Sequence, residues 1–137
     1  MKNNIILIGL IFKILFSTIV WSNSIEPFNF DVTEIEITEN GNKFRGFNRG
    51  KIKTDNNIVI DADQFDYDKP SNVLNATGNV KIVDTINNYI IYTNDITYLK
   101  KEEKIFTKGY SKAVNEKTTI EANKFIYDKN LNILIAT

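Results

Sequence analysis

The sequence predicts an all-β protein: an antiparallel meander of long, bent strands that forms an open β-jelly-roll, a V-shaped slab. Three observations predict this fold, namely an internal repeat, turn signals at regular intervals, and apolar residues that alternate between the turns. The composition agrees, because 137 residues with only 2 prolines and 6 glycines, rich in Ile, Asn, Thr, Phe and Tyr, favour strands joined by Asn-rich turns. A chain of this length holds one domain of ordinary size.

An internal repeat sets the architecture. Residues 60–77 align without a gap with residues 120–137, and the two segments share ten identical residues at an offset of 60. A weaker copy lies between them, where residues 93–98 match residues 62–67 at an offset of 31. The period is therefore about 30 residues, which predicts one structural unit repeated along the chain.

Turn signals recur about every 15 residues, so each repeat holds two strands. Asn, Asp and Gly accept positive φ and Pro cannot donate to a ladder, so clusters of these residues end strands. The strands between the clusters hold roughly 11 residues, or some 35 Å at about 3.3 Å per residue. Short connections favour antiparallel neighbours, hence a meander and not a parallel β-helix. The predicted turns are 40–41, 55–57, 69–72, 87–88, 100–103, 115–117 and 129–132.

Alternating apolar residues predict which face of the sheet is buried. Ile58, Ile60 and Ala62 share one parity, whereas Phe65 and Tyr67 share the other. The same slip occurs in the second copy of this segment, which predicts a bend or bulge midway along each long strand. A sheet that bends at the same point in every strand folds over onto itself, and its apolar inner face becomes a continuous trough.

The first 24 residues are interpreted as a signal peptide, so a signal helix precedes the sheet. Lys2 supplies a positive charge, and residues 5–20 are apolar with few exceptions, yet this stretch is shorter than the roughly 20 apolar residues of a spanning helix. Small residues predict cleavage after Ser22 or Ser24, which leaves a mature domain at 25–137. An uncleaved membrane anchor is the alternative. Either way the remainder leaves the cytoplasm.

Cysteine and histidine are absent, which excludes disulfides, thiol nucleophiles, Ser-His-Asp catalysis and nearly every zinc site. The 17 basic and 17 acidic residues give none of the positive excess of a nucleic-acid binder. We therefore expect no catalytic residue, cofactor, metal ion or nucleic-acid partner. For the acidic run at 61–68, two alternatives stay open: a calcium site, whose known loop spacing the run does not fit, and the paired carboxylates of a polysaccharide-cleaving enzyme.

The predicted trough has two interpretations that periodicity does not separate. It is either the packed core of a structural or adhesive β-repeat protein outside the cytoplasm, or a groove that binds lipid. Small inward residues beside large aromatic or aliphatic ones favour some space for an acyl chain. They are Ala62, Ala76, Ala122 and Ala136.

Short phrases of the repeat resemble a known domain. One is Ile60-x-Ala-Asp-x-Phe-x-Tyr-Asp68, and another is Asn72-x-Leu-x-Ala-Thr-Gly-Asn-Val-Lys81. They resemble the organic-solvent-tolerance (OstA-like) domain of lipopolysaccharide-transport proteins, in which a strand carrying Ala-Asp is followed by an aromatic residue and then by Ala-x-Gly-x-Val. The middle copy departs from the family pattern, with Ile96 where Phe stands and Gly109-Tyr-Ser-Lys in place of Gly-Asn-Val-Lys.

The resemblance implies a periplasmic β-jelly-roll, open along one side, that carries lipopolysaccharide between the membranes of Gram-negative bacteria. The soluble bridge protein (LptA-like), an inner-membrane-anchored protein (LptC-like) and the N-terminal domain of the outer-membrane assembly barrel (LptD-like) share this domain. The stretch from 39–47 to 84–85 looks most like the last, so we expect an LptD-like N-terminal fragment, associated with the outer membrane and continuing covalently into a β-barrel. Because the last strand stops one position before the glycine expected from the repeat, we expect the domain at 25–137 to be truncated.

Repeat and resemblance together lead us to expect a non-catalytic conduit whose ligand is lipopolysaccharide. Acyl chains would lie in the trough, and edge strands would pair with other OstA-like domains. The residues expected to line the trough and bind lipid are Ile58, Ile60, Phe65, Tyr67, Leu74, Val80, Ile82, Ile91, Ile96, Tyr98, Ile105, Ile120, Phe125, Tyr127 and Leu134.

Overall fold

The computed structural model describes residues 26–137, so the predicted signal peptide lies outside the described residues. In this part of the chain no helix is long and apolar enough to cross a membrane. The elements are β1 (Phe28–Thr38), the 3₁₀ helix η1 (Glu39–Gly41), β2 (Lys43–Thr54), β3 (Ile58–Ala62), β4 (Gln64–Asp68), β5 (Val73–Asp84), β6 (Tyr89–Leu99), the 3₁₀ helix η2 (Lys100–Glu102), β7 (Lys104–Lys108), β8 (Ser111–Asn115), β9 (Thr118–Ala122), β10 (Phe125–Asp128) and β11 (Ile133–Ala136).

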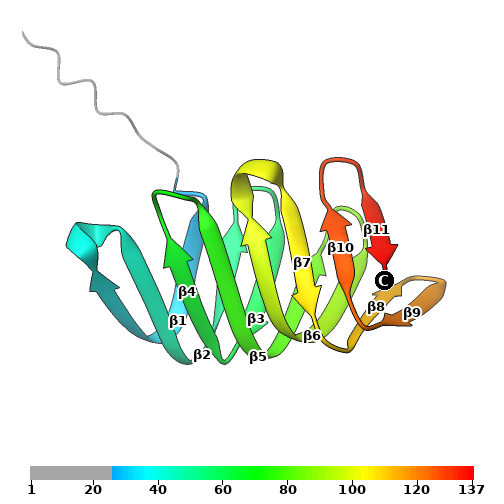
Figure 1. The fold of residues 1–137 in the computed structure, drawn as a ribbon, viewed down its shortest axis with the longest axis horizontal. Helices are drawn as coiled ribbons and strands as arrows, with labels where there is room; N and C mark the ends of the chain where they lie inside the picture. Colours follow the sequence, from blue (N-terminus) through cyan, green and yellow to red (C-terminus); the bar gives the residue numbers. More distant parts are fainter. Residues whose placement is uncertain (1–25) are drawn as a thin grey trace, which may run out of the picture.

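All eleven strands belong to one antiparallel sheet, and they follow the chain as a meander (Figure 1). Strands β1, β2, β5 and β6 are long, with 11 or 12 residues each. The other long strands are interrupted and become the pairs β3 with β4, β7 with β8, and β9 with β10. Each predicted turn falls at a junction between strands. The predicted all-β meander is therefore confirmed.

The sheet bends midway along its strands, where the parity of the apolar residues slips. The break between β3 and β4 falls at Asp63. In β5 a bulge separates Thr77 from Val80, and Gly78 has a φ of +82° there. A side chain at Gly78 would place its Cβ 2.6 Å from Oδ2 of Asp63, so the bend requires glycine on steric grounds as well.

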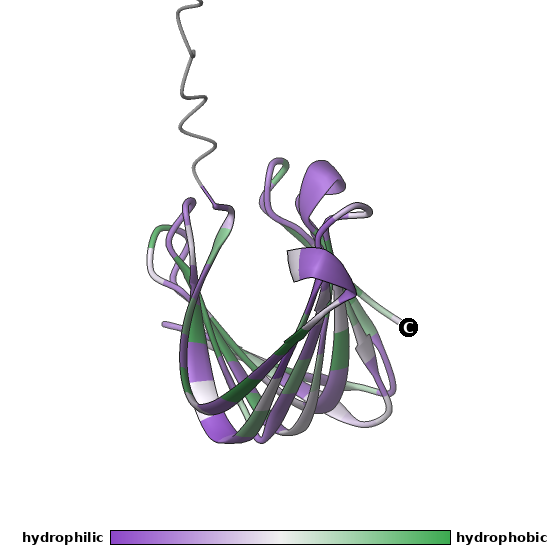
Figure 2. Ribbon diagram, turned by 90° about the vertical axis from the view of Figure 1, so that its left-hand side faces the viewer, coloured by the Kyte–Doolittle hydropathy of each residue, from purple (hydrophilic) through white to green (hydrophobic). Residues whose placement is uncertain are grey.

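The bend divides the sheet into two halves that face each other (Figure 2). The turns lie along the two rims of the open side, opposite the bend, and are largely polar. We call the turns 55–57, 85–88 and 116–117 rim 1, and the turns 39–42, 69–72, 100–103 and 129–132 rim 2. Half 1 contains the segments 28–32, 50–54, 58–62, 80–84, 89–93, 111–115 and 118–122, and half 2 contains 34–38, 43–47, 64–68, 73–77, 95–99, 104–108, 125–128 and 133–136.

The hydrophobic core lies between the two halves. Most strands of both halves contribute to it, because the apolar residues alternate with polar ones that face outward. The buried apolar residues are Phe28, Ile52, Ile58, Ile60, Ala62, Phe65, Tyr67, Leu74, Ala76, Val80, Ile82, Ile91, Ile96, Tyr98, Ile105, Ala113, Phe125 and Tyr127.

Candidate functional site

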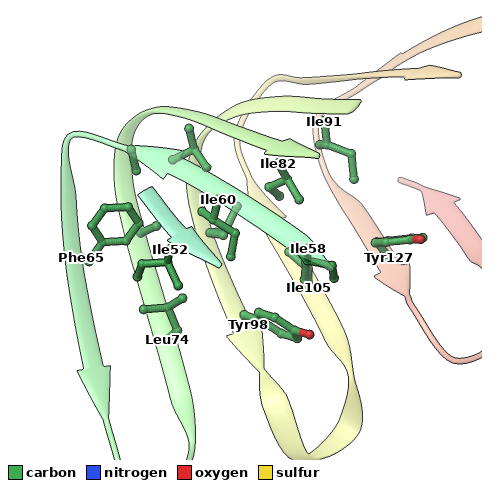
Figure 3. Packing of buried hydrophobic residues seen from close by; sticks show 14 of the residues in the cluster. Ile52, Ile58, Ile60, Phe65, Leu74, Ile82, Ile91, Tyr98, Ile105 and Tyr127 are labelled. Atoms are coloured by element: carbon green, nitrogen blue, oxygen red, sulfur yellow. The ribbon is translucent and has the colours of Figure 1, made fainter. Parts of the chain in front are cut away.

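Two rows of largely apolar side chains run along the inner faces of the halves, at right angles to the strands. Strand register places their members opposite one another on neighbouring strands, and at about 4.8 Å per strand each row extends roughly 30 Å. Figure 3 shows part of both rows pointing into one space. The inner row of half 1 is Phe30, Ile52, Ile60, Ile82, Ile91, Ala113 and Ile120. The inner row of half 2 is Ile37, Phe44, Tyr67, Leu74, Tyr98, Ile105, Tyr127 and Leu134.

Thirteen of the fifteen residues predicted to line the trough lie in the core and are at most 3% exposed. The side chains of the two halves thus fill the space between them, as in an ordinary protein core. A ligand would reach these residues only if the halves moved apart. The thirteen are Ile58, Ile60, Phe65, Tyr67, Leu74, Val80, Ile82, Ile91, Ile96, Tyr98, Ile105, Phe125 and Tyr127.

The other two residues, Ile120 and Leu134, lie on the inner face at its C-terminal end but are less covered. Leu134 is partly buried against the core. Ile120 is opposite the buried Ala113, yet it is 40% exposed because β9 pairs only with β8 among the described strands. A cavity of about 330 Å³ opens between these residues and Tyr89. Within residues 26–137, the inner face is therefore less covered at this end than elsewhere.

Three tyrosines of the core carry their hydroxyl groups to the open side. The Tyr67 hydroxyl donates to Oδ1 of Asn72 at 2.7 Å, and that of Tyr98 donates to Glu103. The Tyr127 hydroxyl donates to Oδ2 of Asp84 at 2.6 Å. Burial raises the pKa of all three, that of Tyr67 to about 12, so the hydroxyls stay neutral. Each ring is thus apolar toward the core and polar toward the rim.

Asp84, the last residue of β5, is the centre of a buried ionic network next to rim 1. Its side chain is 1% exposed, and Oδ2 accepts hydrogen bonds from Nζ of Lys129 at 2.6 Å and Nδ2 of Asn87 at 3.0 Å as well as from Tyr127. Burial alone would raise the pKa of Asp84, but these hydrogen bonds outweigh it and hold the pKa below the usual 3.8. Asp84 is therefore ionised at neutral pH and connects rim 1 to rim 2.

A scan against protein-family models finds no match, and a search of the curated proteins finds no significant relative. Among solved structures, the chain is similar to the crystal structure of LptH from Pseudomonas aeruginosa, the LptA-homologous periplasmic component of a conserved lipopolysaccharide transport device. The match has a TM-score of 0.71 at 15% sequence identity and covers 81% of this chain and 82% of LptH. This chain has the fold of LptH. The likeness to LptH thus agrees with the open β-jelly-roll that the OstA-like motifs imply.

In this LptH-like fold, three strands at the two ends have an unpaired edge. Within residues 26–137, β1 pairs only with β2, β9 only with β8, and β11 only with β10. The inner row of half 1 reaches both ends, at Phe30 and Ile120. Free backbone N–H and C=O groups beside apolar side chains are suited to pairing with another strand.

The acidic run of the sequence lies on the outer face and at the bend, where arginine holds part of it. Arg49 contacts Oδ1 of Asp61 at 2.6 Å and Oδ1 of Asp63 at 2.7 Å. Between residues 26 and 137, no group of three acidic, histidine or cysteine side chains is placed to hold a metal ion.

Several inner residues near the N-terminal end were not predicted from the sequence. Phe28, Phe30 and Phe44 pack against Tyr67, with ring centroids 4.8, 5.9 and 5.9 Å away. Phe28 and Phe30 precede the first clear copy of the repeat, so their alternation within β1 is the only sequence signal that they face inward. Ile52 stands between two lysines, so its neighbours do not mark it as buried. Its position opposite Ile60 on the neighbouring strand is what shows that it faces inward.

Proposed function

We propose that this chain is a non-catalytic carrier of lipopolysaccharide in the periplasm, and that acyl chains bind along its inner rows. The observation that carries the proposal is the pair of apolar rows, which run the length of the fold beneath an open side. The shared fold with LptH, a periplasmic component of a lipopolysaccharide transport device, supports the choice of ligand and compartment. Each CH₂ group buried against the rows would contribute about 0.8 kcal/mol.

We further propose that the edge strands join this domain to others of the same kind. Docking at β1 or at β9 would extend the inner row of half 1, which ends at Phe30 and Ile120 on those strands, so that acyl chains pass between domains without meeting water. From the phrases at 39–47 and 84–85, we infer the assembly-barrel type of this domain, behind a signal peptide and near the outer membrane.

Site-specific photocrosslinking tests lipid binding directly. A photoreactive side chain at Ile120, on the inner face and 40% exposed, should crosslink to lipopolysaccharide in cells. Ile135 is the matched control: it is the same residue type, 48% exposed, but its strand partner Ile126 alternates with the buried Phe125 and faces outward. Phe65 and Ile91 extend the test into the core. Crosslinks to lipid at no inner position, or equally at Ile135, would refute the proposal.

A second candidate function is a structural or adhesive β-repeat protein with a permanently packed core. The near-complete burial of thirteen predicted lining residues favours it. The same experiment separates the two candidates, because a permanently packed core gives no lipid crosslinks from folded protein.

A further inference from the structure

Three ion pairs cross the open side of the trough, one in each repeat. In every pair the lysine belongs to rim 2. The carboxylate belongs to rim 1 (Asp55), to the strand end directly before rim 1 (Asp84) or to the segment that leads into half 1 (Glu26). We call these pairs the clasps. They are Lys69 Nζ with Glu26 Oε1 at 2.5 Å, Lys100 Nζ with Asp55 Oδ1 at 2.7 Å, and Lys129 Nζ with Asp84 Oδ2 at 2.6 Å.

The clasps recur with the repeat in sequence as well as in space. The three carboxylates are 29 residues apart, and each lysine stands two residues after a buried tyrosine of the inner row. The backbone N–H of each lysine also donates to the preceding turn of rim 2. These hydrogen bonds run from Lys69 to Asn42 at 2.8 Å, from Lys100 to Asn72 at 3.1 Å, and from Lys129 to Glu103 at 2.9 Å. An ammonium group is therefore held at the same place in all three repeats.

Only side chains connect the rims. Among residues 26–137, no backbone hydrogen bond joins a turn of rim 1 to a turn of rim 2. Besides the clasps, Asn56 donates to the Tyr98 hydroxyl at 3.3 Å and to Oε2 of Glu103. Asn87 donates to the Tyr127 hydroxyl at 3.0 Å, and that hydroxyl donates to Oδ2 of Asp84 at 2.6 Å. The halves can therefore separate about the bend without the loss of any strand ladder.

We propose that the clasps are exchangeable: they close the empty trough, and when an amphiphile enters between the rims, their lysines bind its phosphate groups in place of the carboxylates. This inference rests on the proposed function. An ammonium group has three rotatable donors and binds phosphate through the same charge-assisted hydrogen bonds as carboxylate. The lysines stand directly above an apolar row, which matches a molecule with phosphates above its acyl chains.

The clasps also differ in how readily they exchange. The side chain of Lys69 is 42% exposed, whereas those of Lys100 and Lys129 are 7% and 8% exposed. Water competes for an exposed ion pair and weakens it. The trough should therefore open first at Lys69, which is also the clasp least needed for folding.

Binding of bisphosphorylated lipid A and of its dephosphorylated form to the purified chain tests the exchange. Lys69→Gln removes a phosphate ligand and should weaken binding of the bisphosphorylated lipid about 2- to 5-fold, whereas Glu26→Gln frees Lys69 and should tighten it by a similar factor. Both variants break the clasp, so both should ease opening to the same extent. Beyond this shared effect, neither should change the affinity for the dephosphorylated lipid. Lys101→Gln is the matched control, because Lys101 lies on rim 2 but donates to Pro70 on the same rim.

Opposite effects of Lys69→Gln and Glu26→Gln, confined to the phosphorylated lipid, support the proposal. Equal effects on both lipids, or the same sign for both variants, would overturn it. Failure of the wild-type chain to bind either lipid would instead overturn the proposed function. Circular dichroism spectra verify that each variant is folded.

A covalent lock gives an independent measurement. The chain has no cysteine, so Glu26→Cys with Lys69→Cys can be joined by a short, cleavable bis-maleimide across the rims. The lock should slow uptake of bisphosphorylated lipid A at least 10-fold, and cleavage of the linker should restore it. The control joins Ser71→Cys to Lys101→Cys within rim 2. Uptake by the locked protein at the rate of the control would contradict opening at this clasp.

Discussion

Removal of the buried lysine of the third clasp should destabilise the fold far more than removal of the exposed one. Lys129→Met leaves Asp84, which is 1% exposed, without a cation. Truncating one partner of a buried ion pair costs about 3–5 kcal/mol. Asp84 retains the hydrogen bonds from Tyr127 and Asn87, so we expect the lower end, about 3 kcal/mol. Lys69→Met, whose pair is exposed on both sides, should cost less than about 1 kcal/mol.

Urea unfolding followed by circular dichroism measures both losses. With a denaturant dependence of about 1–3 kcal/mol per molar, Lys129→Met should lower the midpoint by roughly 1–3 M. The double variant Asp84→Asn with Lys129→Met removes both charges, so it should recover part of this loss. The argument from burial of this pair would be wrong if Lys129→Met lost no more stability than Lys69→Met. It would also be wrong if the double variant lost as much stability as Asp84→Asn and Lys129→Met lose separately, added together.

Three further predictions concern pH, the bend and the core. Asp84 has a lower pKa in the folded than in the unfolded protein, so its ionisation stabilises the fold at pH values above 3.8, and this contribution disappears as the pH falls through the folded value. As the pH is lowered from about 5 to about 2, the unfolding free energy should therefore decrease less steeply in Asp84→Asn than in the wild-type chain. Gly78→Ala should lower the Tm by more than Gly41→Ala, because both glycines have positive φ but only at Gly78 would a Cβ meet another atom, Asp63 Oδ2, within 4 Å; equal losses would contradict the steric argument. Leu74→Ala should cost about 2–5 kcal/mol in urea unfolding, and a loss below 1 kcal/mol would mean that the inner face is not packed.

The sequence contains enough to predict the fold because the repeat and the parity slip are local signals. Ile60 and Phe65 differ in parity, and the structure places them in opposite halves, on either side of the break at Asp63. Turn residues such as Asn72, with a φ of +62°, end strands through their own backbone preference. Parity also identifies the inner face, but it does not show what covers each residue. Ile120 therefore has the predicted orientation without the burial of its equivalent, Ile60.

The clasps could not be predicted from the same local signals. Lys129 stands in a turn, where lysines are ordinarily solvated, and its partner Asp84 precedes it by 45 residues. Its burial depends on how closely the two rims approach, which is a property of the bend angle and of the core packing. The equal spacing of Glu26, Asp55 and Asp84 is visible in the sequence, but it becomes meaningful only when the rims are known to face each other.

A packed inner face and a lipid-binding trough are compatible if the lipid replaces the contacts that opening removes. Separation of the halves would expose the inner rows, and an acyl chain with about a dozen CH₂ groups would bury them again. Burial of these groups would contribute roughly 10 kcal/mol of favourable free energy. The polar contacts are different, because an acyl chain cannot replace an ion pair. The net cost of opening therefore lies in the clasps, and it is largest at the buried pair of Asp84 and Lys129. Opening from the exposed clasp at Lys69 avoids that cost at first, so Glu26→Gln is the substitution expected to speed lipid uptake.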